Sequence, residues 1–213
     1  MDNNKKAVIT KKIEKTMASL KRNNMQAFYA EDKKQAADIA MSLIHESDSI
    51  RCGGSMSLEE AGIISRLRAG SYNFLYQNTP GLTPEQVREI HVSAFTADAY
   101  LTSSNAITEK GELYNVDGNS NRVAAMVYGP KRVIVVAGYN KLVANVEEAA
   151  ERVKAIAGPA NSTRLSRNTP CVPSGRCMDC RSEDRICCNY VVMAMQRHKD
   201  RVKVVIVGEE LGY

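Results

Sequence analysis

The feature that most constrains the fold is a regular alternation of short β-branched segments with longer segments of helical periodicity. The clearest strand pattern is residues 132–137, whose continuous run of valine and isoleucine is typical of a strand buried on both faces. Residues 97–102 and 202–207 also read as strands, and residues 121–127 as a helix. This alternation predicts βαβ units around a mainly parallel sheet with helices on both faces, a Rossmann-like α/β fold.

Helix-capping residues mark where several of the expected helices begin. Asp32, Ser57 and Thr83 are each followed three residues later by glutamine or glutamate, the spacing of a capping box. Asn140 is expected to cap a longer helix that runs through Ile156 and is ended by the Gly-Pro pair that follows. Residues 112–116 fit part of a short hairpin after the strand at 97–102.

Composition is that of an ordinary globular protein, with 44% hydrophobic and 25% charged residues over 213 positions. We therefore expect one domain over residues 1–213, with a cysteine-rich insertion at about 160–190. The net charge of +5 is spread along the chain without a long basic run, which disfavours nucleic-acid binding. No apolar stretch approaches the roughly 18 residues that a membrane span needs, so we expect no membrane span and a cytoplasmic location.

Three polar motifs together resemble the LUD (lactate-utilisation) family. They are RCGGSMS at 51–57, TSSNAITEKGEL at 102–113 and DGNSNRV at 117–123, and the strand motif GPKRVIVVAG at 129–138 is similar as well. The resemblance covers nearly the whole chain and implies a fold related to sugar-phosphate isomerases and coenzyme-A transferases. It also implies a link to bacterial lactate oxidation and to iron–sulfur redox partners.

The first two motifs follow predicted strands, and ligands of open α/β sheets gather beyond the carboxyl ends of strands. Glycines at 53 and 54 let a backbone approach an anion closely, although they equally fit a tight turn that needs positive φ. We expect a small anionic ligand here. The ligand-binding candidates are Gly53, Gly54, Ser55, Ser103, Asn105, Asp117, Asn121 and Arg122.

Two charged residues of these motifs admit a second interpretation. Arg122 stands at a predicted helix start, where a cation opposes the helix dipole unless it meets an anion. A ligand carboxylate or phosphate would meet that need, and so would Asp117. Glu112 is the catalytic candidate, because the resemblance extends to transferases in which a glutamate is the acyl-accepting nucleophile. It also fits a hairpin turn.

Five of the six cysteines fall within 18 residues, in the pattern C-x5-C-x2-C-x6-C-C. The C-x2-C core has the spacing by which two thiolates share one metal. We expect a metal centre, either an iron–sulfur cluster or zinc, and the redox association of the family favours iron–sulfur; reduced thiols are the alternative. Cys52 fits a small core residue. The metal-ligand candidates are Cys171, Cys177, Cys180 and Cys187.

Together these features predict a LUD-family accessory protein of lactate or related 2-hydroxy-acid oxidation. It would bind a small anionic ligand and work with iron–sulfur redox proteins. The alternatives are a stand-alone transferase or isomerase acting on a coenzyme-A thioester or sugar phosphate, and a cysteine-rich interaction module. The sequence assigns no specific ligand, oligomeric state or independent catalytic activity.

Overall fold

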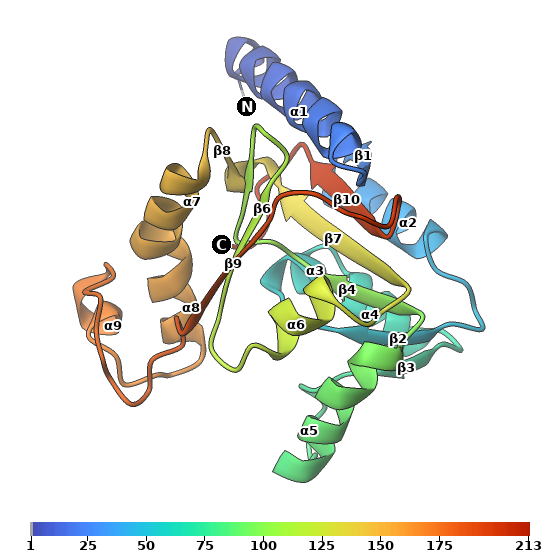
Figure 1. Ribbon diagram of the computed structural model, residues 1–213, viewed down its shortest axis with the longest axis vertical. Coiled ribbons are helices and arrows are strands. Elements are labelled where there is room, and N and C mark those ends of the chain that lie inside the picture. The colour runs from blue at the N-terminus through green and yellow to red at the C-terminus, as the bar shows by residue number, and fades with distance from the viewer. Residues whose placement is uncertain (1) are drawn as a thin grey trace.

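A six-stranded parallel sheet forms the centre of the molecule (Figure 1); the computed structural model describes residues 2–213. Every neighbouring pair in this sheet is parallel, so all six carboxyl ends lie along one edge. The predicted α/β class with a mainly parallel sheet is confirmed. In spatial order the strands are β1 (Gln26–Ala30), β10 (Val202–Val207), β7 (Arg132–Gly138), β4 (Ala99–Thr102), β2 (Ser49–Cys52) and β3 (Asn73–Leu75).

Helices cover both faces of this sheet, each over its own hydrophobic core. On one face, buried residues of α2 (Lys33–Ser42), α3 (Met56–Glu60) and α4 (Ile63–Ala69) pack against the sheet. On the other face the packing comes from α1 (Asn3–Arg22) and α6 (Asn121–Val127). The central strands β4, β7 and β10 are almost entirely buried, because this sheet is covered on both sides.

A second, smaller sheet contains strands that the sequence did not fully reveal. Its order is β8 (Leu142–Val143), β5 (Ala106–Thr108), β6 (Leu113–Asp117) and β9 (Asn189–Met193). Strands β5 and β6 form the expected hairpin, and β9 adds antiparallel to β6. This sheet brings the segment that follows the cysteines back beside the hairpin (Figure 1).

The expectation of one helix from Asn140 through Ile156 is wrong. Residues 139–141 form a 3-10 turn, and Asn145 caps α7 (Val146–Arg152) by accepting a hydrogen bond from the backbone of Glu148. The Asn140 side chain instead binds the backbone of Leu211 and Gly212.

The Gly-Pro pair also fails to end the helical stretch. A π-helical turn, Val153–Ala157, leads directly into α8 (Gly158–Arg164), which has Pro159 near its start. The short helix α9 (Cys171–Ser174) then opens the cysteine-rich segment.

The capping predictions at Asp32 and Thr83 are confirmed, and Thr83 opens α5 (Pro84–Ser93) with a complete capping box. The prediction for Ser57 is wrong by two residues, because Ser55 is the N-cap of α3. Ser57 is thereby free to turn inward, where it is 1% exposed. Across residues 2–213, none of the helices has the length and apolar character to cross a membrane.

Candidate functional site

A cavity of about 520 Å³ opens where the central strands end. Its walls include residues that follow β2, β4 and β7, whose carboxyl ends are adjacent in the parallel sheet. After β2 the chain adds β3 on one side and then β4 on the other, so the strand order reverses here. Such a reversal point is where open α/β sheets bind ligands. Polar lining residues include Gly54, Ser55, His91, Ser103, Asn105, Asp117, Asn121, Arg122, Lys141, Asn161 and Arg164.

The buried lysine of this cavity, Lys141, lies in the 3-10 turn (Tyr139–Lys141) after β7 and is 3% exposed. Its Nζ donates to the Ser57 hydroxyl at 2.9 Å and to the Ser103 hydroxyl at 3.1 Å. Burial, followed by the charges of Arg152 and Arg122, lowers its pKa from 10.5 to about 7. Among residues 2–213 it forms no ion pair with a carboxylate. Lys141 is therefore a lysine that is poised to change its protonation state near neutral pH.

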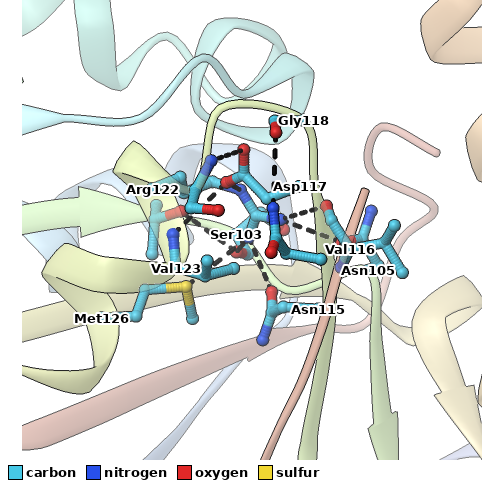
Figure 2. A network of polar contacts seen from close by, with 12 residues as sticks. Ser103, Asn105, Asn115, Val116, Asp117, Gly118, Arg122, Val123 and Met126 are labelled. Carbon is cyan, nitrogen blue, oxygen red and sulfur yellow. Dashed lines mark hydrogen bonds and ion pairs between the residues drawn. The ribbon is translucent and has the colours of Figure 1, made fainter. Parts of the chain in front are cut away.

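Arg122 holds one wall of the cavity together through its guanidinium (Figure 2). It donates to the Asn115 and Asn105 side-chain oxygens at 2.6 and 3.0 Å, and to the Val116 carbonyl at 2.8 Å. Its Nε lies 3.5 Å from Asp117 Oδ2. Of the two interpretations of this residue, the structure shows the pairing with Asp117. Its charge is already met by protein groups, so its main task here is to fasten α6 to the β5–β6 hairpin.

The two glycines of the first motif serve different purposes, and neither has a positive φ. A Cβ on Gly53 would lie 3.0 Å from the Arg122 side chain and 3.1 Å from the Tyr100 hydroxyl, so any side chain here would crowd the arginine. A Cβ on Gly54 would meet nothing closer than 3.7 Å. Gly54 borders the cavity, whereas Gly53 lies behind its wall.

Basic groups outnumber acidic groups around the cavity. Five basic side chains and three carboxylates line it. Asp117 is paired with Arg122, and Asp184 with Arg167 at 3.3 Å. This leaves Lys141, Arg164 and Arg185 against one carboxylate, Glu183, so the unpaired charge favours an anionic occupant.

Comparison with known proteins assigns the family. A family model described as the LUD domain matches residues 13–207, which is most of the chain. This chain belongs to the LUD-domain family. No curated protein sequence matches it significantly.

The fold has a counterpart of known structure. The crystal structure of a DUF162 family protein from Deinococcus radiodurans matches with a TM-score of 0.52 at 17% identity. The match covers 95% of this chain and 97% of that one. At this identity the match supports the shared fold and nothing finer.

The structure of this LUD domain gathers most of the predicted ligand-binding residues around one cavity. All of the eight candidates border it except Gly53. Several of their polar atoms are already engaged: the Ser55 hydroxyl caps α3, and Asn105 Oδ1 accepts from Arg122 and from the Val116 backbone. Because α3 has only five residues, its dipole gives little help to an anion.

The catalytic candidate Glu112 lies apart from the cavity. Its carboxylate accepts a hydrogen bond from the Thr108 hydroxyl at 2.8 Å across the tip of the β5–β6 hairpin, and it does not border the cavity. This contact agrees with the interpretation of Glu112 as a residue of the hairpin turn. The structure gives Glu112 no contact with the lining residues through which it would reach a bound substrate.

The cysteine-rich segment of the LUD domain forms part of the cavity wall, a connection that its sequence gave no sign of. Residues 183–186 and Cys188 border the cavity. The Cys188 backbone N–H donates to the Asp117 carbonyl at 3.0 Å, and Ile186 lies against Gly118. This segment therefore forms part of the cavity wall next to the end of β6.

Three of the four metal-ligand candidates contact or belong to the helical stretch from α7 to α9, in which Cys171 begins α9. The Cys177 backbone N–H donates to the Lys154 carbonyl at 2.9 Å, and the Cys187 sulfur lies near Gly158, within one turn of that helix. Arg185 donates to the carbonyls of both Cys180 and Cys187. Within residues 2–213, however, no three His, Cys, Asp or Glu side chains form a group that could hold a metal ion. The metal centre stays a prediction.

Sequence reasoning missed Lys141, His91 and Arg164 as cavity residues. Lys141 stands among polar residues after a strand, and that position at a carboxyl end is the signal that could have singled it out. His91 stands on α5 and its pKa is lowered by burial. Arg164 ends α8, a helix that was not expected to extend so far.

Proposed function

We propose that this LUD-domain protein is an accessory protein of lactate or related 2-hydroxy-acid oxidation that binds a small carboxylate in the cavity and works with redox partner proteins. The family membership supports the link to lactate utilisation. The observation that carries the carboxylate is Lys141, a buried amine that borders the cavity and has no carboxylate partner among the described residues.

Charge favours a carboxylate, and the cavity has room for a small one. A buried ammonium without a counter-charge is unfavourable, and an incoming carboxylate supplies that charge. Arg164 adds a second cation at the cavity, where it is exposed and hydrogen-bonded to the Asn161 side chain. A ligand of three or four carbons reaches Lys141 and leaves room for water in a cavity of about 520 Å³.

Titration calorimetry with L-lactate and with pyruvate tests this function. We expect one site per chain for at least one of the two acids, and a Lys141→Met variant that loses at least about tenfold in affinity, the scale of one charge-assisted contact. Lys11→Met is the matched control, because Lys11 is exposed on α1 and outside the cavity. Absence of binding by both acids, or equal loss in both variants, contradicts the proposal.

A further inference from the structure

We propose that the Lys141 amine is a nucleophile that forms an imine with a small 2-oxo acid held in the cavity. The inference rests on the proposed function, because oxidation of a 2-hydroxy acid yields a 2-oxo acid. It goes further in assigning a covalent step to a named atom of this chain, Nζ of Lys141. The 2-oxo acid has a keto carbonyl where the 2-hydroxy acid has a hydroxyl group. Imine formation would therefore distinguish the product of such an oxidation from its substrate.

The two hydrogen bonds of Lys141 can be made by the neutral amine, the form that reacts, as well as by the ammonium that attracts a carboxylate. A neutral amine has two N–H bonds and one lone pair, and Nζ has two hydrogen-bond partners, the hydroxyl oxygens of Ser57 and Ser103. Both hydroxyls direct their own protons elsewhere, Ser57 to the Leu211 carbonyl and Ser103 to the Ser104 carbonyl. They therefore accept from the amine, and the lone pair of the neutral amine is left free.

The surroundings favour the neutral form. Lys141 is buried, and the charges that act on it most strongly are the guanidiniums of Arg152 and Arg122, with Glu60 weaker and opposite. These causes lower its pKa to about 7, so a large fraction is unprotonated at neutral pH. A lysine amine made nucleophilic by burial and by neighbouring cations is the form that attacks carbonyl groups.

The segment that covers the amine is held in place around it. Asn140, next to Lys141, accepts from the Leu211 backbone N–H and donates to the Gly212 carbonyl. Gly212 lies so near that a Cβ there would stand 3.5 Å from Nζ and 2.7 Å from the Ser57 hydroxyl. The amine thus faces the cavity from a packed, desolvated corner that limits competing water.

The step balances without an oxidant or reductant. The amine lone pair attacks the carbonyl carbon, a C–N bond forms, and the carbonyl π electrons move to oxygen, which takes a proton to give a carbinolamine. The nitrogen lone pair then forms a double bond to carbon as the hydroxyl takes a second proton and leaves as water. In total the nitrogen gives up two protons, and one molecule of water is released.

Borohydride trapping with pyruvate as the probe tests the inference on the whole chain. Sodium borohydride reduces an imine to a stable secondary amine, so intact-protein mass spectrometry should show one added reduced pyruvate. Peptide mapping should place it on Lys141 at least about tenfold above any other lysine. L-lactate has no keto carbonyl, so it should give no adduct, and it should protect Lys141 when present in excess.

Variants and a second readout keep the two proposals separable. Lys141→Arg keeps a cation and should abolish the adduct, and Ser103→Ala should keep the adduct while shifting the pH at which trapping is half-maximal. Pyruvate that binds by calorimetry but gives no adduct at Lys141 overturns the imine and leaves the proposed function standing. Absence of any binding removes both. The peptide map of the native protein tests the imine by itself, so the result does not depend on whether each variant folds.

Discussion

Lys141 and Ser103 lie 38 residues apart in the sequence, yet their Nζ and Oγ atoms are 3.1 Å apart. The parallel pairing of β4 with β7 accounts for this contact, because it aligns the carboxyl ends from which both residues follow. Ser57 reaches the same amine from α3, which follows β2 on the far side of β4. Segments that follow three strands thus converge on one nitrogen, and the contact exists only in the folded sheet.

The first prediction concerns the pH dependence of stability. Below about pH 7 Lys141 is protonated in both folded and unfolded chains, whereas between pH 7 and 10.5 only the unfolded chain keeps the proton. Raising the pH through this window therefore favours the folded state. Between about pH 7.5 and 9, the free energy of unfolding of the native protein should rise relative to Lys141→Met by about 1 kcal/mol per pH unit.

Urea denaturation at several pH values measures this difference. The two proteins share all other titrating groups, including the cysteines and tyrosines that ionise at higher pH. Taking the difference between them therefore isolates the contribution of Lys141. Parallel pH profiles for the two proteins would show that the amine has an ordinary pKa in the folded chain.

The second prediction compares adjacent glycines. Gly53→Ala places a methyl group 3.0 Å from the Arg122 side chain and 3.1 Å from the Tyr100 hydroxyl, and should lower the free energy of unfolding by about 1–3 kcal/mol through overpacking. Gly54→Ala meets nothing closer than 3.7 Å and should change stability by less than about 0.5 kcal/mol. Thermal denaturation of both variants checks the pair, and equal effects would contradict the assigned roles.

The third prediction separates two arginines of the cavity. Arg122→Met removes the cation paired with Asp117, a mostly buried carboxylate, and removes donors from two asparagines, so it should destabilise the fold by about 3–5 kcal/mol. Arg164→Met removes an exposed side chain and should leave stability within about 0.5 kcal/mol while weakening carboxylate binding. Chemical denaturation and calorimetry on the same samples give both values; a stable Arg122→Met would show that the network is dispensable.

The sequence predicted the strands of the central sheet well because their signals are local. The β-branched runs at 132–137 and 202–207 are each long enough to mark a buried strand, and β7 and β10 follow them closely. The helix at 121–127 has the predicted bounds. The sequence misled where a side chain makes a distant contact in place of the expected local one. Asn140 was expected to cap a helix, but its side chain binds the backbone of residues 211 and 212.

The candidate site was predicted only as far as the chain positions of its loops allowed. Parallel strand ends bring polar loops together, and this rule gathered Gly54, Ser55, Asn105 and Arg122 correctly around one cavity. It said nothing of which polar atoms would remain free. Arg122, the expected anion ligand, is held by protein groups, whereas Lys141 has no carboxylate partner, because its hydrogen-bond partners are neutral hydroxyls.

The last prediction concerns the cysteine-rich segment. Cys177 and Cys180 are partly exposed, and their backbones are tied to the π-helical turn and to Arg185. Burial raises the pKa of the Cys187 thiol, and Cys171, Cys177 and Cys180 all lie near enough for their charges to raise it further. Thiolates clustered in a loop with few apolar residues are typical of a metal centre whose binding orders the loop. Protein prepared without oxygen, with iron and zinc both supplied, should carry metal, with an absorption band near 400 nm if an iron–sulfur cluster forms.

Cys177→Ser and Cys180→Ser should each lose that metal and make residues 165–190 sensitive to protease. Cys52→Ser is the control, because it changes a buried core cysteine, and it should leave the metal content and the protease pattern unchanged. Native protein that carries only traces of metal would identify these side chains as free thiols.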